Sequence, residues 1–386
     1  MENKSQFIFF FSITLSIILL FNLFGTREVN ILLAFLNVLT LFYLFYKRKL
    51  KVNGILLIFL LLLFVTTIVG FFYSNKFSIW QIIRSHIWLP LSLIILKSTS
   101  EIVKNEDVSF FEINKICNFI KFYTISIFIL CVADIIFKIN LSPNMFYLSE
   151  NSLYTRYYYP LIEPFLFFLP ILIYKNYKLT SIFLIILSFL TVTKSIIFIS
   201  LYFLIFTFLL LEKGSDQKKF AIKIFVITII ILFTLFIFKS EIFFDRTYNI
   251  LSFKYSSRFE QISDFKYYLN ENDFKLIKLF FGSGLGSPYR SLDLFYIEDI
   301  YVLRSLVNLQ YDIENGIVAL VFHCGLIGSF FYMAILLNSF KQYKIFILLF
   351  IIPIFVGTSP IGVNHFFEMF FLGISINYFI YKNKKL

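Results

Sequence analysis

Arg258 is the residue whose place in the sequence most clearly indicates a chemical role. It lies between Ser257 and Glu260, which have the spacing of a capping box at the start of a helix. A cation in the first turn of a helix is disfavoured by the helix dipole. A bound anion would remove this conflict, because the helix N–H groups and the guanidinium would point at it together. The pattern therefore predicts an anion site at Arg258.

Carboxylates occur in two places where they could act as acids or bases. Glu163 follows Arg156 and precedes Pro164, and it lies just inside an apolar stretch, where a carboxylate needs a partner. Glu314 lies just before an apolar run that begins at Gly316. An acid in that position can simply stabilise the start of a helix, and Arg156 with Glu163 can simply form a structural ion pair.

A glycine-rich run, Phe281-Gly-Ser-Gly-Leu-Gly286, predicts a tight turn. It lacks the Lys-Ser/Thr pair of a phosphate-binding P-loop and the strand-helix setting of a dinucleotide site. The run therefore does not indicate nucleotide binding.

These residues must be positioned by membrane helices. The chain has 386 residues, of which 59% are hydrophobic and only 15% charged, with mean hydropathy +0.83. A soluble protein of this size would expose far more polar surface. The net charge of +12 does not predict nucleic-acid binding, because the lysines separate apolar runs and do not gather on one soluble face.

The predicted fold is an all-α polytopic membrane protein with twelve transmembrane helices and one large extracytoplasmic loop. A span needs about 20 apolar residues. By this rule the spans lie at residues 7–24, 29–46, 54–73, 82–96, 116–137, 158–174, 179–192, 196–211, 220–238, 316–337, 345–356 and 366–380. The chain thus divides into nine helices over residues 1–238, the loop over 239–315, and three helices over 316–386.

The loop at residues 239–315 stands out by its charge, since it holds nine of the 35 Lys and Arg and 11 of the 23 Asp and Glu. Basic residues gather in the short loops on the other side, which predicts cytoplasmic termini and an outward-facing loop.

Residues 98–114 are expected to form a polar cytoplasmic connector, and three prolines predict an irregular start to the span at 158–174. The span from Gly316 is expected to run through Gly325 and Gly328, which allow close helix packing. The three cysteines, Cys117, Cys131 and Cys324, are expected to be small core residues.

Taken together, the chain resembles the O-antigen polymerase/ligase family of membrane glycosyltransferases. The resemblance covers the architecture and four short motifs. They are Thr191-Val-Thr-Lys-Ser195, Arg156 followed by Glu163-Pro164, Ser257-Arg258 followed by Phe281-Gly-Ser-Gly-Leu-Gly286, and Glu314-Asn315-Gly316 followed by Gly325-Leu-Ile-Gly328.

The resemblance implies a substrate and a reaction. The substrate would be a sugar chain on a polyprenyl diphosphate carrier, and the growing chain would move onto a hydroxyl of the next repeat unit. No cofactor or metal is expected, because the diphosphate already activates the sugar and arginines can stabilise the leaving group. The resemblance also implies a bacterial inner-membrane location, with a chain-length regulator and a flippase as partners besides the lipid bilayer.

Residue roles follow from the motifs. Glu314 is expected to be the general base, since a carboxylate at a low-dielectric interface can have the raised pKa that a base needs. Arg258 is expected to bind the diphosphate. The remaining candidates for substrate binding are Arg84, Arg156, Glu163, Lys194, Arg290, Arg304 and Asn315. The histidines His86, His323 and His365 are expected to be packing or interface residues.

Two other functions remain open. Ligases of this family carry a histidine where this chain has Glu314, and this departure favours a polymerase over a ligase. A flippase for the same lipid-linked sugar is the alternative from another class. Flippases tend to have short loops and two related halves, and neither feature occurs in this sequence.

Overall fold

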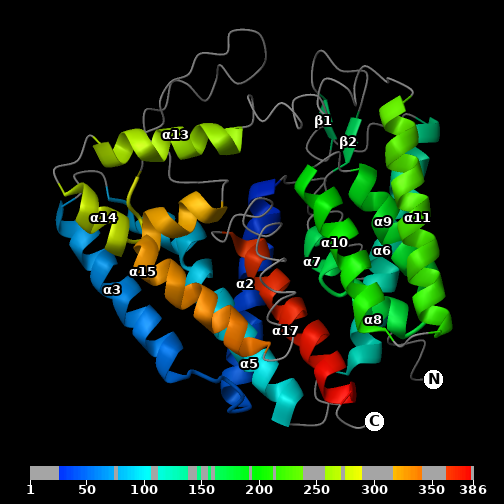
Figure 1. Cartoon of the computed structure of the whole chain (residues 1–386), viewed down its shortest axis with the longest axis horizontal. Coiled ribbons are helices and arrows are strands. Elements are labelled where there is room, and N and C mark those ends of the chain that lie inside the picture. Colours follow the sequence, from blue (N-terminus) through cyan, green and yellow to red (C-terminus); the bar gives the residue numbers. More distant parts are fainter. Residues whose placement is uncertain are drawn as a thin grey trace. The chain divides into compact units, whose positions relative to one another are not determined.

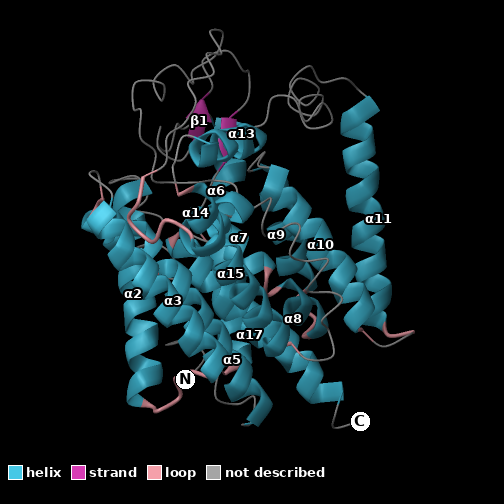
Figure 2. Cartoon of the chain, turned by 60° about the vertical axis from the view of Figure 1, so that its left-hand side comes forward, coloured by secondary structure: helices cyan, strands magenta, loops and turns pink. Residues whose placement is uncertain are grey.

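The structure is a computed structural model of the whole chain. It describes residues 26–73, 77–105, 112–137, 146–148, 155–157, 161–190, 194–211, 214–237, 257–270, 274–288, 316–340 and 362–383. These residues are almost entirely helical, with one short two-stranded ladder (Figure 2). The helical fold class expected from the sequence is therefore confirmed for the described part of the chain.

The chain divides into two compact units. Unit 1 comprises Met1–Lys49, Thr99–Phe238 and Phe370–Leu386, and unit 2 comprises Leu50–Ser98 and Lys239–Met369. Two helices, α5 (Trp88–Asn105) and α17 (Val363–Asn383), have residues in both units.

Unit 1 is built around α10, which packs against four other helices, while α6 packs against α9 (Figure 1). A two-stranded antiparallel ladder joins β1 to β2, with Tyr147 opposite Arg156. The elements of unit 1 are α2 (Thr26–Tyr46), α6 (Ile113–Phe137), β1 (Phe146–Leu148), β2 (Thr155–Tyr157), α7 (Ile162–Leu166), α8 (Leu169–Tyr174), α9 (Lys178–Leu190), α10 (Lys194–Leu210) and α11 (Asp216–Ile237).

The irregular start predicted for the span at 158–174 appears as a break between α7 and α8. Pro170 lies in the first turn of α8 and has no N–H to continue the helix from α7. The carbonyl of Phe167, at the break, accepts a hydrogen bond from Ser375 Oγ at 2.7 Å. Just beyond α8, the Tyr177 hydroxyl donates to Asn118 Oδ1 at 2.9 Å, and burial raises the pKa of Tyr177 above its usual value.

Unit 2 is built around α15, which packs against α14 and α3, and α13 lies across α14 and α15 (Figure 1). Besides its parts of α5 and α17, its elements are α3 (Gly54–Tyr73), α4 (Ile79–Gln81), the π-helical turn η1 (Ile82–His86), α13 (Ser257–Asn270), α14 (Lys275–Phe281) and α15 (Gly316–Ser339). The helix predicted from Ser257 onward is present as α13, while the residues before Ser257 lie outside the described part, so the predicted cap stays a prediction.

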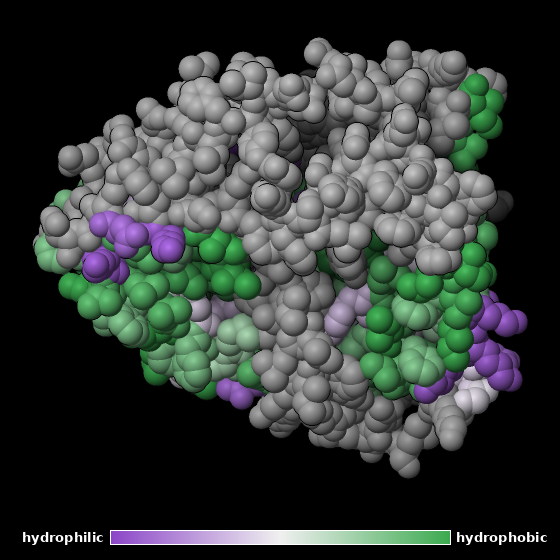
Figure 3. All heavy atoms as spheres, turned by 45° about the horizontal axis from the view of Figure 1, so that its top comes forward, coloured by the Kyte–Doolittle hydropathy of each residue, from purple (hydrophilic) through white to green (hydrophobic). Residues whose placement is uncertain are grey.

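The helix α3 shows why these segments fit a membrane. Its N-terminus is capped by Asn53, whose Oδ1 accepts the Leu56 N–H at 2.9 Å. From there the helix is apolar on every face, and large side chains such as Phe64 and Phe72 are 64% and 74% exposed. Hydrophobic residues likewise cover much of the described surface in Figure 3. Such a surface is suited to lipid and not to water.

Within the described residues, four helical segments are long and apolar enough to cross a membrane. They are Gly54–Phe72, Ile79–Val103, Ile113–Ala133 and Gly316–Ser339. The spans predicted at residues 7–24 and 345–356 lie outside the described residues. The count of twelve spans, the outward loop and the division at residues 238 and 315 therefore stay predictions.

Two expectations were wrong. The polar connector predicted for residues 98–114 is helical as far as Asn105, because α5 continues through it with Ser98, Thr99 and Ser100 buried. The Ser98 hydroxyl accepts the Lys51 N–H at 2.9 Å, so this polar side chain makes a packing contact. The uninterrupted helix predicted through Gly325 is broken there, since Gly325 has φ 68° and ψ 178°.

Gly325→Ala is expected to destabilise the protein, whereas Gly54→Ala is not. A side chain at Gly325 would have a strained positive φ, which costs about 1–3 kcal/mol, and its Cβ would collide with the Phe280 carbonyl. A Cβ at Gly54, by contrast, meets nothing within 4 Å. Thermal unfolding in detergent would measure the difference, and equal midpoints for the two variants would contradict the assignment of the break.

Candidate functional site

The break in α15 creates the polar centre of unit 2. In a continuous helix the carbonyls of Phe322 and His323 would accept N–H groups one turn later. Here they accept instead from the glycine-rich turn, Ser283 N–H to Phe322 O at 2.7 Å and Gly284 N–H to His323 O at 3.1 Å. The turn therefore replaces the missing helical hydrogen bonds of α15.

The next two N–H groups of the turn donate hydrogen bonds to side chains. Leu285 N–H bonds to Thr67 Oγ1 on α3 at 3.0 Å, and Gly286 N–H bonds to His86 Nδ1 on η1 at 2.8 Å. Four consecutive backbone donors, from Ser283 to Gly286, thus have protein acceptors. An anion-binding nest needs such donors free, so this turn holds helices together and does not bind phosphate through its backbone.

Glycine is required where the turn meets α3. Gly284 has φ 79°, and a Cβ there would lie 2.6 Å from Thr67 Cα and 2.7 Å from the Thr66 carbonyl carbon. Any side chain would therefore push the turn away from α3 and break its hydrogen bonds to α15 and to Thr67.

Two histidines, His86 and His323, flank the turn with opposite roles. Their ring centroids lie 4.5 Å apart, and both side chains are buried. His86 Nδ1 accepts a backbone N–H, so its proton belongs on Nε2, whereas His323 Nδ1 lies 2.9 Å from the Gly284 carbonyl and must donate to it. A neutral His323 then presents a bare Nε2, which is buried and has no hydrogen-bond partner within the described structure. Such a nitrogen can accept a proton or a hydrogen bond.

Arg84 lies on η1, two residues before His86, and its side chain is exposed. Its backbone carbonyl accepts from Trp88 Nε1 at 3.2 Å, which ties the π-helical turn to α5. Single π-helical turns next to α-helices are frequent at functional sites. The backbone of Arg84 is thus held on η1, the element that contacts the glycine-rich turn through His86.

The helix α13 covers the turn and α15. Phe265 and Tyr268 pack against Val318, Ala319 and Phe322, and the Tyr268 hydroxyl bonds to Ser283 Oγ at 2.9 Å. The face of α13 that carries Phe265 and Tyr268 is therefore the one that packs on α15. Arg258 lies in the first turn of the same helix.

The sequence-predicted site residues fall into three groups. Unit 2 holds Arg84 on η1 and Arg258 on α13. Unit 1 holds Arg156 on β2, Glu163 in the first turn of α7 and Lys194 at the start of α10. The remaining four, Arg290, Arg304, Glu314 and Asn315, lie outside the described residues.

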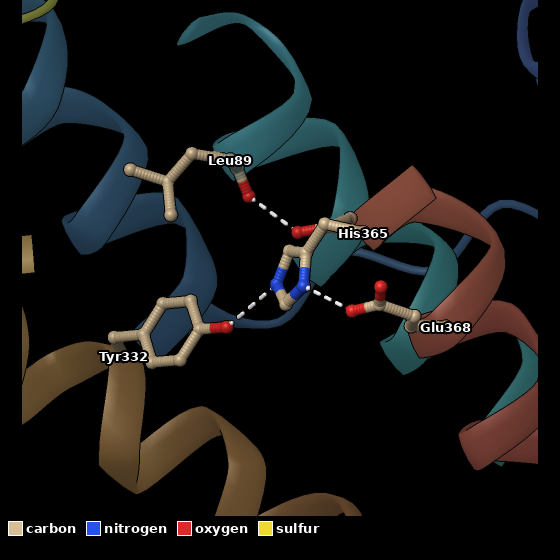
Figure 4. Close-up of polar contacts among 5 residues, drawn as sticks. Leu89, Tyr332, His365 and Glu368 are labelled. Atoms are coloured by element: carbon tan, nitrogen blue, oxygen red, sulfur yellow. Dashed lines mark hydrogen bonds and ion pairs between the residues drawn. The ribbon is translucent and has the colours of Figure 1, made fainter. Parts of the chain in front are cut away.

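A second polar cluster joins α15 to α17. The His365 ring lies between two groups, with Nε2 3.0 Å from the Tyr332 hydroxyl and Nδ1 3.0 Å from Glu368 Oε2 (Figure 4). All three side chains are buried. The His365–Glu368 pair carries no net charge whether the shared proton sits on the carboxyl or on the ring, and this neutrality makes its burial possible. Such a chain can pass a proton between its ends.

Sequence reasoning expected His86 and His323 to be packing or interface residues, and both are buried, but it did not predict their hydrogen bonds to the turn or that of Thr67. No local pattern marks them, since each binds a turn more than 35 positions away. The partner of Glu368 was detectable, because His365 lies three residues earlier on the same helix face. Within the described residues, no group of three or more His, Cys, Asp or Glu side chains is placed to hold a metal.

Thr67→Val is expected to lower the free energy of unfolding by about 1–3 kcal/mol, because it leaves the Leu285 N–H without its acceptor. Thr66→Val is the matched control, since the Thr66 hydroxyl donates only to Leu63 in its own helix. Denaturant titration in detergent measures both variants. Equal stability of the two would show that the Thr67 contact does not hold the turn.

The chain was compared with protein-family models, with curated proteins and with solved structures, and none of the three comparisons gave a match. What the site does is therefore inferred from the chemistry of its own residues.

Proposed function

We propose that this chain is a membrane glycosyltransferase that polymerises polyprenyl-diphosphate-linked oligosaccharide repeat units into O-antigen or capsular polysaccharide. The proposed protein has twelve spans in the bacterial inner membrane, cytoplasmic termini and a large outward loop over residues 239–315. The observation that carries the proposal is the anchored glycine-rich turn, Phe281 to Gly286, with the exposed Arg84 beside it.

The turn supports the proposal because it belongs to the motif on which the resemblance rests. Its backbone donors are used by Phe322, His323, Thr67 and His86, so it is a rigid support. Arg84 belongs to η1, which the turn contacts, and Arg258 belongs to α13, whose Tyr268 is bonded to Ser283. Both arginines are thus on elements that the turn fixes, as precise binding of a diphosphate requires.

In the proposed reaction the anomeric carbon of the growing chain is the electrophile. The acceptor hydroxyl of the next repeat unit attacks it and gives its proton to Glu314. The bond from the anomeric carbon to the diphosphate oxygen breaks, and the lipid diphosphate leaves with the electron pair. Arg84 and Arg258 stabilise the charge that develops on the leaving group, since the guanidinium fits phosphate oxygens in pairs.

Further residues, some of them in unit 1, are proposed to contact the substrate without taking part in the chemical step. Arg156, Glu163 and Lys194, with Arg290, Arg304 and Asn315 elsewhere in the chain, are proposed to bind the sugars and the diphosphate. Glu163 is the second residue of α7, and the N-cap residue Leu161 has φ 70°, so the backbone turns sharply into the helix.

Arg84→Ala, Arg258→Ala and Glu314→Gln are each expected to lower polymer yield by about 100- to 1000-fold, because each removes a fixed electrostatic contact or the base. Gel analysis of the polysaccharide measures the yield, and immunoblotting of membranes confirms normal protein levels. Lys219→Ala, which removes an exposed cation on α11, is the control and should leave the yield unchanged.

The lipid-linked products distinguish the alternatives in the same strains. A polymerase defect leaves single repeat units on the carrier at the outer face. Long chains left on the carrier would indicate a ligase, and single units retained inside the cell would indicate a flippase. Normal polymer in all three variants would contradict the proposed site.

A further inference from the structure

The short helix α14 exposes a cluster of apolar side chains. Phe274, Leu276, Ile277, Phe280 and Phe281 are between 43% and 63% exposed, and they are five of eight consecutive residues. The other face of α14 packs against α15. An apolar patch of this kind on a water-facing helix would be unfavourable, so it requires a partner.

The chain around the patch shows where that partner lies. The glycine-rich turn follows α14 directly and contacts three of the apolar segments that are long enough to span a membrane. It meets α3 at Thr67, six residues before the end of the helix at Tyr73. It meets His86 and His323, each seven residues after the start of its segment at Ile79 and Gly316. At 1.5 Å per residue, all three contacts lie about 10 Å inside the ends of these segments.

The backbone of the turn satisfies the condition for such a depth. Non-helical backbone inside a membrane is tolerated only where protein groups satisfy its polar atoms. The N–H groups of residues 283–286 all have acceptors, and the carbonyls of Ser283, Gly284 and Gly286 accept from Ser287 Oγ, His323 Nδ1 and Ser78 N–H.

We propose that residues 274–287 form a re-entrant segment, with α14 seated at the lipid interface and the glycine-rich turn about 10 Å deeper. The occupant of the exposed apolar face is the lipid bilayer itself. α3 likewise exposes Val69, Phe71 and Phe72 at the end where its Gly70 meets Ser283 of the turn. Lys275 is exposed and reaches the headgroups, while the Lys278 ammonium lies 5.1 Å from the Tyr268 ring centroid, away from lipid.

The inference rests on α3 and α15 being membrane spans and does not depend on the transferase activity. It changes the loop expected from the sequence, because residues 239–315 would then include a part that returns to the membrane. The loop would be anchored to lipid through α14 and to protein through the turn.

Site-directed spin labelling of the reconstituted full-length protein tests the proposal. A background with Cys117, Cys131 and Cys324 replaced by Ala receives a single nitroxide at Ile277→Cys, in phosphatidylethanolamine–phosphatidylglycerol vesicles. Collision rates with oxygen, which concentrates in lipid, and with a water-soluble nickel chelate report its surroundings. Phe64→Cys on α3 supplies the lipid reference and Lys219→Cys, at an exposed ion pair on α11, the water reference.

The oxygen-to-nickel ratio at Ile277 is expected to be several-fold above that at Lys219 and below that at Phe64, because Phe64 lies near the middle of α3 and α14 lies at the interface. A ratio equal to that at Lys219 would overturn the proposal. Leu276→Cys, which is also exposed, repeats the measurement should the first variant fail to fold. No substrate is added, so the measurement reports the position of α14 whether or not the protein is a polymerase. Failure of this proposal and failure of the proposed function can therefore be told apart.

Discussion

The structure of unit 2 depends on one requirement, that polar backbone groups in apolar surroundings must be hydrogen-bonded. The break at Gly325 releases the Phe322 and His323 carbonyls in the middle of an apolar helix. Leaving such groups unpaired costs several kcal/mol each in hydrocarbon. The N–H groups of Ser283 and Gly284 remove this cost, and their positions then fix the rest of the turn. The contacts with Thr67, His86 and Tyr268 follow from that docking.

This arrangement gives the glycine-rich run a different meaning from the one its pattern first suggests. Glycine runs are often associated with phosphate, because they expose backbone donors. Here the same donors bind protein, and the glycines are needed for close approach to α3 and α15. In the proposed function a diphosphate would therefore be bound by side chains, and Arg84 and Arg258 are on elements that the turn contacts.

The sequence predicted the helical class and most described elements well, because long apolar runs such as residues 54–73 have few other folds. The break before Pro170 was predictable from local rules of backbone geometry. The break at Gly325 was not, because its cause is a peptide about 40 residues earlier in the chain. For the same reason the bonds of His86 and His323 to the turn were not predictable, although both are buried packing residues as expected, and the roles of Arg84 and Arg258 stay predictions.

The break in α15 also bears on how the protein is made. A segment inserting alone into the membrane can satisfy the Phe322 and His323 carbonyls only as an unbroken helix, since the turn is not yet docked. The bend would then form late, when the two segments meet and exchange one set of hydrogen bonds for another. Assembly of this region would thus remodel a helix after insertion, where most membrane proteins only bring finished helices together.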